Sequence, residues 1–211
     1  MYGSSCYSAS LRDRLNSALR DIAQAQTLCN APSISVGVLH NGEVILRESM
    51  GLRDVERGVK AYPDTAYRLA SCSKILTSAT LGVLVNEGTI SLGDLIKKHL
   101  PEFNPSEDPR IGAEGKILGV CRHSIGLGNP NMAVNGPHGT IVSSGKDYVH
   151  LVNACPTSNE HGQRFRSWWF YSNIAYGLMA NLAKAATGSS FVEILKTKVL
   201  EPLGLRQTLI S

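Results

Sequence analysis

A β-hairpin that lies between helical segments constrains the fold of this 211-residue chain more than any other feature. Two runs rich in β-branched residues, 34–39 and 43–46, are joined by Asn41-Gly42, the pair best suited to the positive φ angles of a type I′ turn. Before the hairpin, apolar residues recur at helical spacing over 11–28. Helical patterns dominate the remainder, so the sequence predicts an α+β fold.

Downstream of the hairpin, apolar spacing and capping residues predict further helices. A helix that is expected to be buried covers 74–86 and ends before Gly88. The segment 51–64 is polar and is expected to form turns, and 101–145 carries five prolines and is expected to be loop apart from a short helix near 118–123. The other expected helices cover 92–100, 147–153, 172–187 and 190–200, the last of them beginning at a capping box of Ser190 and Glu193.

Charge and cysteine content exclude several classes of protein. The 21 Lys and Arg against 17 Asp and Glu give a net charge of +4, which is too small and too dispersed to predict binding to nucleic acid or to a membrane surface. Five scattered cysteines without a C-x-x-C spacing indicate neither a disulfide framework nor a zinc site. No apolar stretch approaches the roughly 20 residues that cross a bilayer, and no secretory signal is evident. We therefore expect a cytoplasmic protein.

The first candidate for chemistry is a Ser-x-x-Lys pattern, Ser71 and Lys74, at the start of the predicted helix 74–86. Residues three apart share a helix face, so the lysine amine can lie beside the serine hydroxyl. A serine becomes an effective nucleophile when a neighbouring group takes its proton, and the positive end of a helix favours the negative charge that develops. The pattern is common by chance, and on its own it favours a different interpretation, in which Ser71 is an ordinary helix N-cap.

A second pattern, Tyr171-Ser172-Asn173, stands at the start of the predicted helix 172–187. A Ser-x-x-Lys that follows a helix and a hairpin, and that is itself followed by Tyr-x-Asn, resembles the serine β-lactamase and penicillin-binding protein superfamily. Within that superfamily the chain is most similar to the class C β-lactamase and esterase-like branch. Its connecting segments also resemble those of the family, in the family's order, at 35–38, 86–92, 100–103, 171–177 and 200–205.

The resemblance implies a β-lactamase/transpeptidase-like fold, an α/β sandwich with a helical subdomain. Residues 11–70 would form the helix and hairpin of the sheet part, 71–200 the helical and loop-rich part, and 201–211 the start of a missing C-terminal part, so that 1–211 would be one incomplete domain.

The resemblance also implies roles for four residues. Ser71 would be the acylated nucleophile, and Lys74 would share or relay its proton. Tyr171 would be the partner base, and Asn173 would orient the lysine and hold a substrate amide or ester. The chemistry requires no metal or cofactor, and the expected partner is a small-molecule ester or amide. The acyl donor, the acceptor and the oligomeric state stay open.

Other residues near these motifs allow more than one interpretation. Tyr171 could simply be an aromatic packed with Trp168, Trp169 and Phe170, which hint at an apolar substrate but more often form core. His123 lies in a segment that resembles the family's His-x-x-Gly-Leu loop, and we expect it to hold that loop by hydrogen bonds. The other histidines show no metal-ligand spacing.

The family's third motif, a Lys-Thr-Gly or His-x-Gly on a strand facing the nucleophile, does not occur here in a suitable context. The sequence His40-Asn41-Gly42 is the hairpin turn, 196–198 lacks the glycine, and His138-Gly139 lies in the loop-rich segment. We therefore expect the N-terminal portion of a longer hydrolase, a truncated gene model or a degenerate copy, in that order of preference. Loss of one oxyanion donor would make activity very low, and the alternative function is a non-catalytic remnant or binding protein.

Overall fold

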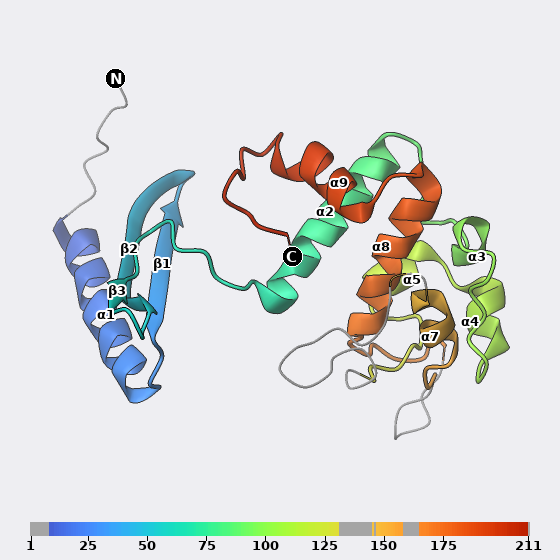
Figure 1. Ribbon diagram of the computed structural model, residues 1–211, viewed down its shortest axis with the longest axis horizontal. Helices are drawn as coiled ribbons and strands as arrows, with labels where there is room; N and C mark the ends of the chain where they lie inside the picture. The colour runs from blue at the N-terminus through green and yellow to red at the C-terminus, as the bar shows by residue number, and fades with distance from the viewer. Residues whose placement is uncertain (1–8, 131–144, 146, 158–164, 211) are drawn as a thin grey trace. The chain divides into compact units, whose positions relative to one another are not determined.

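The chain separates at Arg68 into two units that hold different secondary structure, and each is described by itself. The computed structural model describes residues 9–130, 145, 147–157 and 165–210. The first unit contains one long helix and a small sheet, and the second is built from helices (Figure 1).

The first unit is an antiparallel sheet with a helix running beside it (Figure 1). Its three strands follow each other in the order β1-β2-β3, and its elements are α1 (Ala9–Leu28), β1 (Ser33–His40), β2 (Glu43–Asp54) and β3 (Val59–Lys60). Asn41 and Gly42 have φ angles of 50° and 81°, as a type I′ turn requires. The predicted helix and hairpin are confirmed.

Strand β2 is longer than the sequence predicted, because the segment 51–64, which was expected to form turns, contains the end of β2 and all of β3 as well as turns. The strand continues to Asp54, and its end pairs with β3 through Leu52 and Lys60. Gly51 lies within the strand at a φ of 82°, where only a residue without a side chain is easily accommodated. Gly51 made the composition at the end of β2 resemble that of a turn, although the strand continues through this residue.

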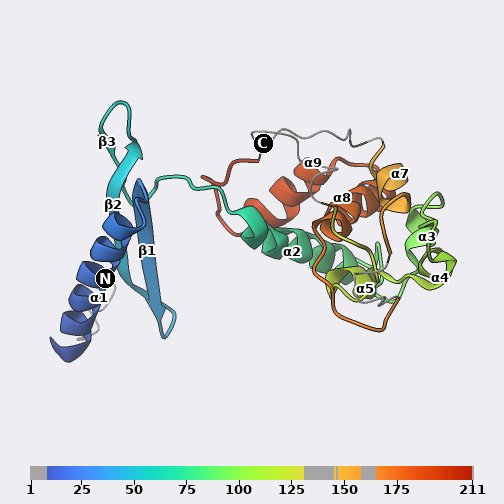
Figure 2. The ribbon, with the colours of Figure 1, turned by 90° about the horizontal axis from the view of Figure 1, so that it is seen from below.

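The second unit is arranged around α8 (Asn173–Thr187), which packs against α2, α3, α5, α7 and α9 (Figure 2). Six of its side chains belong to the buried core, among them Ile174, Leu178 and Leu182. The other elements are η1 (Ala70–Cys72), α2 (Ser73–Asn86), α3 (Ile96–His99), α4 (Pro109–Glu114), α5 (Ile117–Cys121), α7 (Tyr148–Asn153), α9 (Phe191–Leu195) and η3 (Lys196–Leu200), a π-helical turn.

Capping residues set the ends of these helices, and those at Gly188 and Ser190 were predicted from the sequence. The Ser172 hydroxyl accepts from the Ala175 N–H at 3.2 Å at the start of α8, and Gly188 ends that helix at a φ of 77°. The Ser190 hydroxyl likewise accepts from the Glu193 N–H at 3.2 Å. Because these signals are local, they define the helix that presents the second motif before any tertiary contact is considered.

Two expectations for this unit need correction. The loop-rich segment also contains α4, which begins at Pro109 after an N-cap, Asp108, whose carboxylate accepts from the Arg110 N–H. Helix α2 is not buried from its start, because Ile75 is 72% exposed and only Thr80, Leu81 and Leu84 are fully buried.

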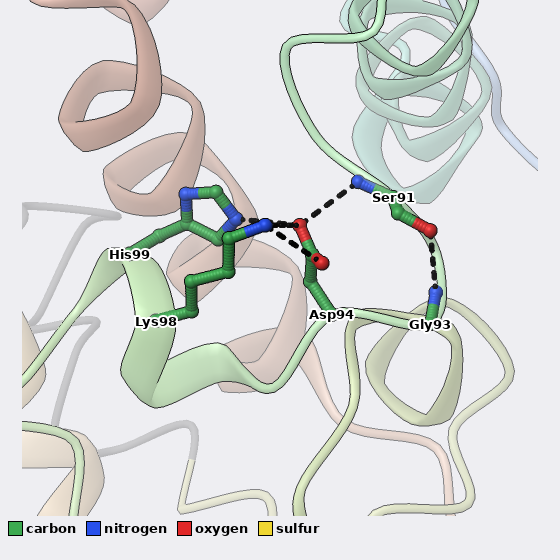
Figure 3. A network of polar contacts seen from close by, with 5 residues as sticks. All are labelled: Ser91, Gly93, Asp94, Lys98 and His99. Atoms are coloured by element: carbon green, nitrogen blue, oxygen red, sulfur yellow. Dashed lines mark hydrogen bonds and ion pairs between the residues drawn. The ribbon is translucent and has the colours of Figure 1, made fainter.

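A network of polar contacts centred on Asp94 joins the loop before α3 to α3 itself (Figure 3). The Asp94 carboxylate accepts from the Ser91 N–H at 3.0 Å and from the Lys98 ammonium at 2.9 Å, and it lies 2.9 Å from Nε2 of His99. The hydrogen bonds from His99, Lys98 and Ser91 hold the pKa of Asp94 well below its usual range. The folded state therefore favours the ionised carboxylate.

Acid should weaken this network. A carboxyl group with a lowered pKa stabilises the fold above its unfolded pKa, about 3.9, and this stabilisation is lost as the pH falls through the folded value. We predict that Asp94→Asn lowers the free energy of unfolding at neutral pH and makes its decline below about pH 4 shallower than in the wild type. Urea unfolding over a pH series measures this, with Glu201→Gln, at an exposed position, as the control. Equal curves for wild type and Asp94→Asn would contradict it.

Candidate active site

Ser71 lies in a short 3₁₀ turn, η1, immediately before α2. The N-cap of α2 is Cys72, and no side chain caps that helix by a hydrogen bond, so the interpretation of Ser71 as an N-cap is wrong. Ala70 has a φ of 46°, a left-handed conformation that is strained for alanine, and its carbonyl accepts from the Ser73 hydroxyl at 2.6 Å. The turn leaves the Ser71 side chain exposed and able to bond elsewhere.

The Ser71 hydroxyl contacts Tyr171, which lies 100 residues further along the chain. Their oxygens, Oγ and Oη, are 2.6 Å apart, and either hydroxyl can be the donor. Tyr171 directly precedes Ser172, the N-cap of α8, whose buried hydroxyl also donates to the Gly128 carbonyl at 2.8 Å. The capped end of a core helix therefore sets where the phenol is placed.

Lys74, one residue inside α2, links the two motifs. Its ammonium donates to Oδ1 of Asn173 at 2.6 Å and lies 3.4 Å from Oγ of Ser71. It also lies over the rings of Tyr171 and Tyr176, 4.8 and 5.5 Å from their centroids. The structure thus brings all four predicted site residues together, while their catalytic roles stay predictions.

The arrangement favours the ionised form of the Tyr171 phenol. Two hydrogen bonds lower the pKa of Tyr171 from its usual value of 10.0. The bond from Lys74 has the larger effect, and the bond from Ser71 has the next largest. A cation beside a phenol stabilises the phenolate that a proton acceptor requires. The group that Ser71 contacts is therefore easier to ionise than an ordinary tyrosine.

Three residues that support the site were not assigned this role from the sequence. The Asn173 N–H donates to Oδ1 of Asn129 at 2.8 Å, and Tyr176 contributes the second ring beneath Lys74. Tyr176 could have been found, because it lies three residues after Asn173 and shares its helix face. His123 was expected to hold only its own loop, but its Nδ1 also accepts from the Ser172 N–H at 3.2 Å.

The aromatic residues before Tyr171 are not core. Trp168 and Trp169 are 59% and 60% exposed, so the interpretation of these side chains as packed interior is wrong. The Trp169 ring lies 6.4 Å from the Tyr171 ring, between centroids. An exposed indole therefore stands beside the candidate base.

In the described residues, no group of three His, Cys, Asp or Glu side chains is arranged to hold a metal ion. Cys29, Cys72, Cys121 and Cys155 are free thiols, and Cys6 lies outside the described residues. Within the same part of the chain, every helix is too short or too polar to span a bilayer.

The geometry predicts that Lys74 controls the ionisation of Tyr171. Replacing Lys74 with Met should raise the pKa of Tyr171, because the hydrogen bond that favours the phenolate is lost. The near-ultraviolet absorbance of tyrosinate, taken as the difference from a Tyr171→Phe protein, measures this titration alone. Lys184→Met, at an exposed position in the last turn of α8, is the control and should change nothing. An unshifted Tyr171 titration in Lys74→Met would refute this role.

Sequence comparison identifies several relatives. The chain is 27% identical over 178 residues to Protein flp of Staphylococcus aureus strain NCTC 8325 / PS 47, covering 84% of this chain and 34% of that protein. It is 28% identical over 177 residues to the teichoic acid D-alanine hydrolase of Staphylococcus aureus, covering 82% of this chain and 40% of that protein. The chain thus spans well under half the length of these relatives.

Structural comparison finds the same fold. The octameric penicillin-binding protein homologue from Pyrococcus abyssi superposes with a TM-score of 0.76 at 24% identity, over 90% of this chain and 43% of that one. FmtA from Staphylococcus aureus superposes with a TM-score of 0.67 at 22% identity, over 89% and 49%. The predicted β-lactamase/transpeptidase-like fold is confirmed. The Beta-lactamase family model matches residues 19–211, so this chain belongs to the beta-lactamase family.

Proposed function

We propose that the protein is a serine hydrolase or acyltransferase that acts on an ester or amide through an acyl group on Ser71. The observation that carries this proposal is the 2.6 Å contact between Oγ of Ser71 and Oη of Tyr171, beside the Lys74 ammonium. A hydroxyl nucleophile within hydrogen-bond distance of a base, with a third group to position that base, is the arrangement of nucleophilic catalysis. Asn173 holds the ammonium in place.

In the first half of the reaction, the Ser71 oxygen bonds to the substrate carbonyl carbon while its proton passes to the Tyr171 phenolate. The Lys74 ammonium stabilises the phenolate before this transfer. The positive end of α2 lies beside the nucleophile and favours the negative charge of the tetrahedral intermediate. The bond to the leaving alcohol or amine then breaks, that group takes the proton from Tyr171, and the acyl group stays on Ser71.

In the second half, a water or an acceptor alcohol or amine attacks the acyl carbon. Tyr171 accepts the proton of the attacking group and then returns it to Oγ of Ser71 as the acyl bond to serine breaks. Ser71 and Tyr171 regain their initial protonation states. No metal or organic cofactor takes part in either half.

The exposure of the site and the names of its relatives support a substrate class for this proposal. Ser71 is exposed, and the neighbouring indole of Trp169 offers an apolar surface, which suits an acyl group with an apolar part. The relative named teichoic acid D-alanine hydrolase supports hydrolysis of an acyl group.

Covalent labelling tests the proposal directly. A fluorophosphonate forms a stable bond to an activated serine, so we expect it to modify Ser71, with the adduct mapped by mass spectrometry. Ser71→Ala should abolish that adduct. Tyr171→Phe and Lys74→Met should slow labelling by about 100- to 10,000-fold, the usual contribution of general base catalysis.

Ser189→Ala is the matched control, because it removes a serine hydroxyl beyond the far end of α8, where the Ser189 N–H donates to Oγ1 of Thr187 at 3.2 Å. It should label at close to the wild-type rate. Labelling that persists in Ser71→Ala would remove the proposal. A wild-type protein that folds but does not react at Ser71 would favour a non-catalytic binding protein of the same fold.

A further inference from the structure

His123 binds the backbone on both sides of Tyr171. Its carbonyl accepts from the Phe170 N–H at 2.8 Å, and its ring Nδ1 accepts from the Ser172 N–H at 3.2 Å. One residue therefore fixes the chain immediately before and immediately after the candidate base. The φ of His123 is 55°, a left-handed conformation that glycine and asparagine adopt more easily than most residues.

The imidazole also contacts the rings that surround the Lys74 ammonium. Its centroid lies 4.8 Å from that of Tyr171, with an interplanar angle of 37°, and 5.1 Å from that of Tyr176. Trp169 meets it edge-on at 5.7 Å. The phenol of Tyr171 is therefore supported on its ring as well as through the backbone.

Only a neutral imidazole can make this set of contacts. Nδ1 accepts a hydrogen bond only when it carries no proton, so the proton must be on Nε2, and a protonated ring would have two donors and no acceptor. In the part of the chain that the structure describes, the titratable and charged groups facing the ring are Lys74 from α2, Tyr171 ahead of α8 and Tyr176 in α8. Burial, and then the charge of Lys74, lower the pKa of His123, which favours the neutral form of the ring.

We propose that His123 is a positioning residue that, in its neutral form, holds the Tyr171 phenol against Ser71, and that its protonation in acid releases Tyr171. This inference rests on the proposed function, since it gives the histidine a part in activating the same serine. His123 does not contact the reacting atoms. It acts through the two backbone bonds and the ring contact.

Two substitutions separate the side chain's bond from the backbone conformation. His123→Gly keeps the left-handed conformation but removes the acceptor, whereas His123→Asn tolerates that conformation and offers an amide oxygen to the Ser172 N–H. We expect fluorophosphonate labelling of Ser71 to slow by about 10- to 100-fold in His123→Gly, the scale on which loss of positioning acts. The fall should be in the maximal rate, with little change in the probe concentration for half-maximal rate, and His123→Asn should recover most of it. His150→Asn, at an exposed position in α7, is the control.

The pH dependence of the labelling rate distinguishes the proposed role from a merely structural one, which would not change its slope. As the pH falls, the labelling rate of the wild type should first decline with the slope of a single protonation, that of Tyr171. The slope should then become steeper as His123 takes a second proton. His123→Asn cannot take the second proton, so its decline should stay at the shallower slope. Profiles of equal slope in the two proteins would overturn the proposal, and this comparison decides the question even if His123→Gly does not fold.

A second readout does not depend on acylation. The tyrosinate titration of Tyr171, isolated by difference from Tyr171→Phe, should shift toward the usual tyrosine pKa in His123→Gly, because the phenol is no longer held beside Lys74. If the wild type fails to label but this shift is seen, the proposed function is wrong and the positioning role stands. An unchanged titration in a folded His123→Gly protein would refute the positioning role.

Discussion

The bond between the Ser71 hydroxyl and the Tyr171 phenol is the interaction on which the site depends. It joins two segments 100 residues apart, and each segment is fixed by its own element. Ser71 stands in the turn that leads into α2, and Tyr171 stands ahead of the capped start of α8. Because α2 and α8 pack together in one core, small displacements in that core would change the contact between the two oxygens.

Lys74 makes this contact chemically useful. A serine and a tyrosine are both neutral near pH 7 in their ordinary state, and neither takes a proton from the other without help. The ammonium, held by Asn173, lowers the pKa of the phenol, and we propose that this turns the hydrogen bond into a path for proton transfer. In the proposed account, the surrounding rings and backbone bonds, including those of His123, keep the phenol within reach of both partners.

The fold was predictable where its signals are local. The Asn41-Gly42 turn and the caps at Ser190 and Gly188 depend on one or a few residues, and the structure confirms them. The continuation of β2 was not predictable in this way, because Gly51 gives the strand the composition of a turn. Helix α4 was likewise missed inside a segment rich in proline.

The residues of the candidate site could be predicted from the sequence, but the side chains and backbone groups that surround them could not. Two short motifs and a family resemblance identified Ser71, Lys74, Tyr171 and Asn173 as one group. Their supports come from a loop and a helix face that meet only in the folded chain, so His123 could not be connected to Tyr171 from spacing alone. The exposure of Trp168 and Trp169 could not be predicted from the sequence either, because apolar composition by itself favours burial.

A double-mutant cycle on Lys74 and Tyr171 tests the central claim most directly, with the rate of phosphonate labelling at Ser71 as the measured quantity. If the lysine acts by making the phenol a base, the protein carrying both Lys74→Met and Tyr171→Phe should react no more slowly than the slower single variant. If the two effects instead multiply, each residue acts on Ser71 independently, and the account of a single proton-transfer unit is contradicted.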